Sequence, residues 1–217
     1  YSLGGTDASY FDINSTTGKV TLKVSADFET KSSYSLQVSA SDGMASVNKA
    51  ITVNVTNVNE APTNVMLSAS TVAENTSTAS ALTVGTLTGI DPDFGSTVTY
   101  SIAGGADQAS FQISGANLQF KSGTTLNHEA QSSYAVTVRA TDQGGLTYDK
   151  AFTVNLTDVN EAPTVANTIG NQSANATQAF SYQFASNTFA AVDAGQTLTY
   201  TATKGDGSPL PGWLTFS

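Results

Sequence analysis

Residues 55–63 read VTNVNEAPT and residues 156–164 read LTDVNEAPT. Seven of the nine letters agree at an offset of 101 residues, so the two stretches are copies of one motif. Outward from it, SSYSLQVSASDG from Ser32 recurs as SSYAVTVRATDQGG from Ser132, and PDFGSTVTY from Pro92 recurs as VDAGQTLTY from Val192. A fixed period of this kind identifies a modular array. The chain is therefore predicted to consist of units of about 100 residues.

The copies divide the chain into three parts. Residues 1–63 are predicted to be the last two-thirds of one unit, residues 64–164 a complete unit, and residues 165–217 the first half of another. Within the complete unit, apolar and polar residues alternate with the period of a β-strand. The residues expected to face the core are Tyr134, Val136, Val138, Ala140, Phe152, Val154 and Leu156. Seven short strands without helical periodicity predict an all-β fold, a Greek-key seven-stranded β-sandwich repeated along an elongated array.

The composition excludes several classes of function. The 217 residues include no Cys, a single His (His128), 8 basic residues and 17 acidic residues, for a net charge of −9. Nucleic acid is not an expected partner because the chain cannot assemble a basic face. No apolar run is long enough to span a membrane. An enzyme is not expected either, because acidic pairs two residues apart in a turn offer no substrate cleft between them.

Most of the acidic residues lie at corresponding places in the repeats. Carboxylates crowded at a junction between two units repel each other unless a cation binds, and a hard divalent cation with six to eight oxygen ligands suits such a site. The twelve acidic residues at repeat landmarks are Asp27, Glu29, Asp42, Glu60, Glu74, Asp91, Asp93, Glu129, Asp142, Asp158, Glu161 and Asp193.

The segments VAEN, ADFE, VSASDG, TNVNEAPT and GIDPDFG together resemble the calcium-binding motifs of cadherin repeats, and the resemblance covers residues 1–164. It implies Ca²⁺ at the junctions between units. Asp42 would serve a junction further upstream. At the junction of the first two units, the implied ligands are Asp27, Glu29, Asn57, Asn59 and Glu60 from the first unit and Asp91, Asp93 and Asp142 from the second.

The second junction departs further from the family pattern. Ala191 stands where the first Asp of the D-x-D motif is expected, and Asn127 replaces the Asp of D-x-E. Fewer or weaker calcium ions are therefore expected there. The implied ligands are Glu74, Glu129, Asp158, Asn160, Glu161 and Asp193.

The third unit resembles a dystroglycan-type cadherin-like domain through LTYTATKGDGSPLPGWLTFS, which ends the chain. Trp213 in this stretch could stack on a sugar. A role in core or edge packing is the stronger expectation, because Leu210, Leu214 and Phe216 surround it in sequence.

These features predict a segment of a large cell-surface or secreted adhesion protein, extracellular and bacterial in origin, in which calcium stiffens a stalk. Its partners would be calcium and, by resemblance, homophilic or other cell-surface protein or glycan ligands. The alternative is a carbohydrate-binding accessory module of a secreted polysaccharide-degrading enzyme. That alternative requires exposed aromatic residues, whereas nearly all Tyr and Phe residues are expected to point inward.

Overall fold

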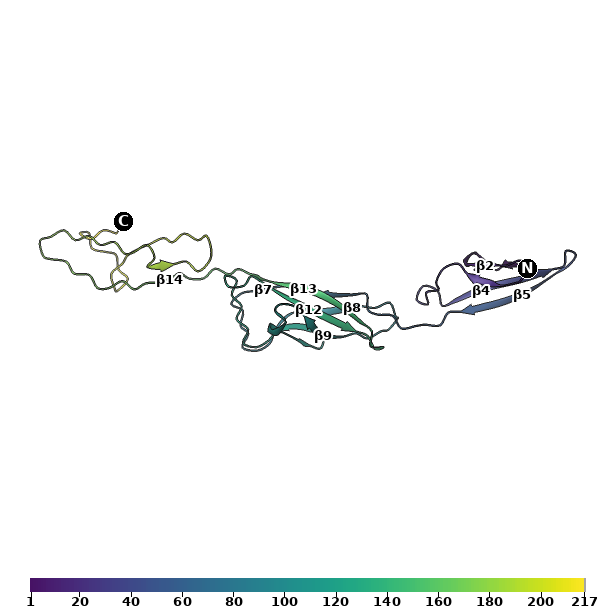
Figure 1. Ribbon diagram of the computed structural model, residues 1–217. Helices are drawn as coiled ribbons and strands as arrows, with labels where there is room; N and C mark the ends of the chain where they lie inside the picture. Colours follow the sequence, from purple (N-terminus) through teal and green to yellow (C-terminus); the bar gives the residue numbers. More distant parts are fainter. Residues whose placement is uncertain (217) are drawn as a thin grey trace.

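The computed structural model describes residues 1–216, and in it the chain forms a row of β-rich units with the N- and C-terminal units at opposite ends (Figure 1). Every regular element of the described residues is a β-strand except two short 3-10 turns, η1 (Ala8–Tyr10) and η2 (Gln108–Ser110). Within residues 1–216, no helix has the length and apolar character needed to cross a membrane. The predicted all-β array is confirmed.

The central unit is a sandwich of two four-stranded sheets. The first sheet has the order β10 (Phe111–Ser114), β11 (Asn117–Phe120), β8 (Leu82–Ile90) and β6 (Asn64–Leu67). The second has the order β7 (Thr71–Ala73), β13 (Thr147–Thr157), β12 (Ser133–Thr141) and β9 (Thr99–Gly104).

The first of the seven strands predicted for this unit is divided between the two sheets, as β6 and β7. The stretch NVMLSAS from Asn64 predicts one continuous strand, but β6 ends at Leu67 and the chain crosses to the other sheet. There β7 pairs in parallel with β13, with Val72 opposite Leu156. Three residues of parallel pairing leave too short a pattern of alternation to read from a sequence.

The core of the central unit follows the predicted alternation. Tyr134, Val136, Val138 and Ala140 on β12 are all buried, as are Val154 and Leu156 on β13, while Phe152 is partly buried. The Phe111 and Phe120 rings stack with their centroids 4.6 Å apart, and the Tyr134 ring meets Phe120 edge-on at 5.1 Å. These aromatic contacts stabilise the sandwich beyond the area that they bury.

The N-terminal unit repeats part of this architecture. Its sheet has the order β1 (Ser2–Gly4), β4 (Ser33–Ser41) and β5 (Ser46–Asn54), and β2 (Phe11–Ile13) pairs with β3 (Val20–Leu22). Phe11 meets Tyr34 edge-on at 5.3 Å, 100 residues before Phe111 and Tyr134. The sequence repeat therefore corresponds to a repeat of core contacts.

A carboxylate that accepts a backbone hydrogen bond also recurs in the two units. Asp7 Oδ2 accepts a hydrogen bond from the backbone N–H of Ser35 at 2.7 Å, and Asp107 Oδ2 accepts one from Ala135 N–H at 2.7 Å. Each Asp precedes a 3-10 turn, which it ties to the long strand beside it. These two acids are structural and lie outside the predicted junction set.

The C-terminal unit has few regular strands among its described residues. It contains β14 (Thr164–Val165) paired with β15 (Phe189–Ala190), and an isolated bridge between Thr203 and Pro209. Phe184 packs edge-on against Phe189 at 5.6 Å and lies 5.3 Å from Tyr200. Trp213 is 82% exposed, so the expectation that it packs in the core or at an edge is wrong.

Candidate metal centres at the junctions

The first junction is organised around Asp93, in the turn between β8 and β9. Its side chain is buried, and its Oδ2 accepts a hydrogen bond from the backbone N–H of Glu60 at 2.8 Å. Its Oδ1 accepts a second bond from Asn57 Nδ2 at 3.2 Å. Glu60 and Asn57 belong to the linker that leaves β5, so a carboxylate of the second unit holds the linker of the first.

Asp142 makes a second contact of this type. Its Oδ2 accepts a hydrogen bond from Asn59 Nδ2 at 2.7 Å, and its Oδ1 accepts one from Leu146 N–H at 2.8 Å. These hydrogen bonds outweigh the opposing effect of burial, which is the largest single influence, and hold the pKa of Asp142 below its usual value. The carboxylate is therefore ionised and fixed against the linker.

Gly144 makes this approach of the linker possible. A Cβ atom at this position would lie only 2.6 Å from the Asn59 side-chain amide. Gly144 was not among the predicted site residues. The sequence does mark this turn, because DQGGL from Asp142 has one residue more than DGMA from Asp42.

Three carboxylates converge where the units meet. Oxygen atoms of Glu29, Glu60 and Asp93 lie within 4.8 Å of one another. Burial, followed by the negative charges of Glu29, Asp93 and Asp27, raises the pKa of Glu60 above its usual value. Without a cation, this cluster therefore disfavours the ionised form of Glu60.

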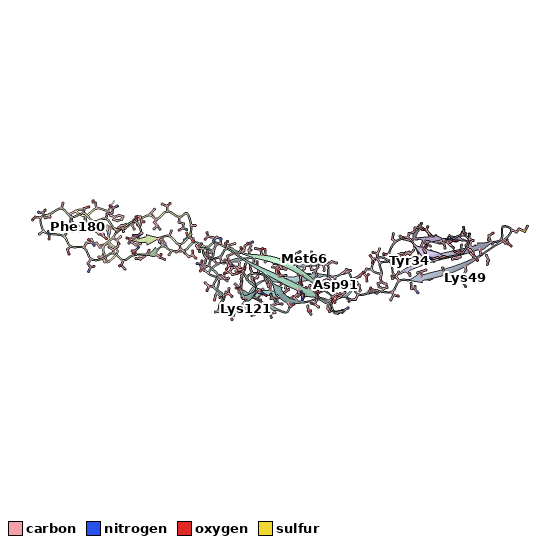
Figure 2. The ribbon with its side chains drawn as sticks, in the orientation of Figure 1. Tyr34, Lys49, Met66, Asp91, Lys121 and Phe180 are labelled. Carbon is pink, nitrogen blue, oxygen red and sulfur yellow. The ribbon has the colours of Figure 1, made fainter. Side chains whose placement is uncertain are left out.

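Two oxygen atoms beside this cluster are buried without a hydrogen-bond partner among the described residues. They are Asp91 Oδ2 and Ser96 Oγ. Asp91 lies at the end of the central unit that faces the N-terminal unit (Figure 2). Asp91 Oδ1, in contrast, accepts a hydrogen bond from Asp93 N–H at 2.9 Å. Buried polar atoms are nearly always paired, so these two call for a partner such as a bound ion.

The second junction contains a further carboxylate group. Glu74 directly follows β7 and is only 2% exposed. Its two oxygens accept backbone hydrogen bonds from Val159 and His128, both at 2.7 Å, and these bonds lower its pKa. Oxygens of Glu74, Glu129 and Glu161 lie within 4.8 Å of one another. Ligand atoms of His128, Glu129 and Asp158 lie equally close together.

The contact between linker and Asp is reproduced at this junction. Glu161 N–H donates to Asp193 Oδ2 at 3.2 Å, as Glu60 N–H does to Asp93. A hydrogen bond from Asn75 lowers the pKa of Glu161, but the Asp193 carboxyl, burial, and the charges of Glu74 and Glu129 together raise it above its usual value. Glu161 Oε2 and Asp193 Oδ1 are buried and have no hydrogen-bond partner within residues 1–216.

The linker Asn makes different hydrogen bonds at the two junctions. At the first, Asn59 Nδ2 donates to Asp142 Oδ2. Asn160 Oδ1 accepts a hydrogen bond from Gln196 Nε2 at 2.7 Å, and the same nitrogen donates to Asp193 Oδ2. Gln196 was not a predicted site residue. It corresponds to Ser96 in the alignment of PDFGSTVTY with VDAGQTLTY.

Two further predicted residues are held by local hydrogen bonds in turns of the first unit. Asp42 lies in the turn between β4 and β5, where its Oδ1 accepts hydrogen bonds from Met44 N–H at 2.9 Å and Ala45 N–H at 2.8 Å. Asp27 accepts bonds from the backbone N–H of Thr30 at 3.0 Å and from its hydroxyl at 2.8 Å. Asp27 still contributes negative charge at Glu60.

The expectation that nearly all aromatic residues point inward is wrong. Phe94, in the turn that carries Asp93, is fully exposed, and Phe28, beside Glu29, is 36% exposed. Both residues line a shallow groove at the first junction. The turn directs Asp93 toward the linker and leaves Phe94 in solvent.

Comparison with known proteins assigns families to two segments. Residues 69–157 match the family described as "Cadherin domain", and residues 162–217 match the one described as "Putative Ig domain". The C-terminal match is thus to an Ig-like family, and the dystroglycan-type assignment is not confirmed.

Two curated relatives carry cadherin names. The chain is 31% identical over 182 residues to human Cadherin-related family member 2, covering 76% of this chain and 14% of that protein. It is 28% identical over 164 residues to mouse Protocadherin Fat 4, covering 74% of this chain and 3% of that protein. The chain thus spans a small part of the length of these relatives.

Solved structures share the fold. The structure titled "Protocadherin gammaB7 EC3-6 cis-dimer structure" has a TM-score of 0.56 at 26% identity, covering 78% of this chain and 43% of that one. Human Protocadherin-24 EC1-2 has a TM-score of 0.57 at 21% identity, covering 72% and 80%. The chain therefore carries cadherin-like β-sandwich repeats.

Proposed function

We propose that this chain is a calcium-stiffened segment of a large cell-surface or secreted adhesion protein. The observation that carries the proposal is the convergence of oxygen ligands at the first junction. There Asp93 of the second unit accepts a hydrogen bond from Glu60 N–H in the linker, while the nearby Asp91 Oδ2 is buried without a hydrogen-bond partner among the described residues.

The donor atoms fit a hard cation. Carboxylate and amide oxygens suit Ca²⁺, which accepts six to eight oxygen ligands in flexible geometry. The ligands proposed for the first junction are Asp27, Glu29, Asn57, Asn59, Glu60, Asp91, Asp93 and Asp142. Those proposed for the second are Glu74, Glu129, Asp158, Asn160, Glu161 and Asp193. Asp42 is proposed to serve a junction with a unit further upstream.

Bound calcium would supply positive charge between carboxylates that otherwise repel. Residues from both units and from the linker would then share ligands, which fixes the angle between neighbouring sandwiches. Extracellular calcium modules bind at about 10⁻⁴ to 10⁻³ M, so at about 5 mM calcium each site adds roughly 1 to 2.3 kcal/mol to the stability of the bound form. The array becomes a rod at extracellular calcium concentrations.

The proposed calcium affinity determines where the chain would function. Sites of such affinity fill outside cells and stay empty in the cytosol, so we place the chain at the cell surface or in the extracellular space. The names of the relatives, Cadherin-related family member 2 and Protocadherin Fat 4, support an adhesive parent protein. Homophilic or other cell-surface ligands are the proposed partners, and a bacterial source remains a prediction of the sequence.

Thermal unfolding of the full chain, with EDTA or with about 5 mM calcium, tests the proposal. Calcium should raise the midpoint by several degrees, and the isosteric double variant Asp91→Asn/Asp93→Asn should lose most of that gain. Asp12→Asn/Asp206→Asn removes the same charge at sites away from both junctions and should keep the full gain. An equal shift in all three proteins would contradict a site at the first junction.

A further inference from the structure

We infer that Gln196 substitutes for one cation at the second junction, with its side-chain amide joining the linker to the C-terminal unit. The inference rests on the proposed function, because it assigns the two junctions different numbers of calcium ions. The Gln196 amide nitrogen donates to Asn160 Oδ1 at 2.7 Å and also to Asp193 Oδ2. Asn160 belongs to the linker, and Asp193 belongs to the turn that accepts a hydrogen bond from the linker at Glu161 N–H.

The orientation of this amide follows from its partners. A carboxylate oxygen can only accept, so the Gln196 atom that faces Asp193 must be the nitrogen. Asn160 Nδ2 donates to the backbone carbonyl of Glu161 at 3.3 Å, which turns Asn160 Oδ1 toward Gln196. One N–H group thus points at each of two oxygens that would otherwise coordinate a cation together.

At the first junction, the position that corresponds to Gln196 carries no side-chain amide. In the part of the chain that the structure describes, two buried oxygens lack a hydrogen-bond partner here: the hydroxyl of Ser96, the counterpart of Gln196, and Oδ2 of the neighbouring Asp91. Ser96 is too short to reach the linker, so the oxygens of Asp91, Ser96 and Asp93 remain available to an ion. Replacing Ser by Gln fills this place with a donor that carries no net charge.

The second junction differs from the first at residue 191 as well as at residue 196. Ala191 stands where the first junction has Asp91, so the second junction lacks one negative charge as well as one ligand. The neutral Gln196 amide can pair with Asn160 and Asp193 at this less negative place, whereas a divalent cation there would lack the ligand that Asp91 offers at the first junction. The carboxylates of Glu74, Glu129 and Glu161 converge on a cation position of their own, for which Glu161 Oε2 and Asp193 Oδ1, buried and without a partner among the described residues, remain available. The second junction thus needs one calcium ion fewer than the first and keeps part of its order without calcium.

Calcium bound per chain, measured by equilibrium dialysis of the full chain at saturating calcium, tests this difference. Ala191→Asp/Gln196→Ser should bind one calcium ion more than the wild type, and Ser96→Gln should bind one fewer. Gln183→Ser, at an exposed site in the same unit, should bind the wild-type number. Wild-type numbers in both junction variants would overturn the inference.

Hydrogen exchange in EDTA tests the amide link without any metal. Gln196→Ala should speed amide exchange over residues 158–163, and Gln183→Ala should not. Unchanged exchange in Gln196→Ala, in a chain that binds calcium, would overturn this inference and leave the proposed function standing. A wild-type chain that binds no calcium would overturn the proposed function, and the cation substitution with it.

Discussion

The backbone N–H of Glu60 donates a 2.8 Å hydrogen bond to Asp93 Oδ2, joining the linker of one unit to a turn of the next. The backbone of Glu161 makes the equivalent bond to Asp193 at 3.2 Å. This contact positions the linker carboxylate beside the others at each junction. It also requires the linker N–H to face the downstream unit, which fixes the direction in which that unit begins.

Replacing Gly144 by Ala should disturb the first junction. The added Cβ would press on the Asn59 amide, which in turn holds Asp142. Overpacking of this kind costs about 1 to 3 kcal/mol. Calcium titration of Gly144→Ala should show weaker binding at the first junction. Gly104→Ala, where a Cβ would meet nothing within 4 Å, is the matched control, and equal affinities in the two variants would refute the role of Gly144.

Replacing Glu74 by Gln should destabilise the central unit even without calcium. One side-chain oxygen becomes an NH₂ group that faces a backbone N–H of His128 or Val159, which leaves a buried donor unpaired. In EDTA, the unfolding midpoint should fall by about 5 °C or more. Glu129→Gln removes a charge from the same cluster but leaves the backbone hydrogen bonds to Glu74 in place, so its unfolding midpoint should stay the same or rise. A fall of equal size in both variants would argue against the backbone contacts.

The pH dependence of the first junction should follow Glu60. Because its pKa is raised in the folded protein, the stability it contributes is full below its ordinary pKa of 4.5 and is lost as the pH rises through the higher folded value. In EDTA, NMR titration of the Glu60 carboxyl carbon should give a midpoint above 4.5, and calcium should lower it. Glu29→Gln removes a neighbouring charge and should lower the midpoint without calcium. A midpoint at 4.5 or below in EDTA would contradict the crowding of charge.

Replacing Asp107 by Asn should act independently of calcium. Asp107 Oδ2 accepts from Ala135 N–H and its Oδ1 accepts from Gln131 Nε2, so it ties the η2 turn to β12 inside one unit. The unfolding midpoint of Asp107→Asn should fall by the same amount in EDTA and in calcium. Asp93→Asn offers the contrast, since its loss should be larger in calcium. A calcium-dependent loss in Asp107→Asn would show that the two regions are coupled.

Much of the fold could be read from the sequence because its determinants are local and repeated. The alternation from Tyr134 to Ala140 fixes which face of β12 is buried, since successive strand residues point to opposite sides. The 101-residue offset of VNEAPT predicts equivalent linkers, and the structure gives Glu60 and Glu161 equivalent hydrogen bonds. The strand β7 escaped prediction because its parallel pairing with β13 links residues more than 80 apart.

The sequence by itself determined that several acids fall in turns and linkers at the ends of the strands, because they recur at fixed places in the repeat. Tertiary structure decided how each acid is used, because that depends on distances between residues of different units. It made Glu74 and Asp142 acceptors of fixed hydrogen bonds, left Asp91 Oδ2 unpaired, and placed the Gln196 amide between Asn160 and Asp193. It likewise brought Gly144 into close contact with Asn59 and left Phe94 exposed to solvent.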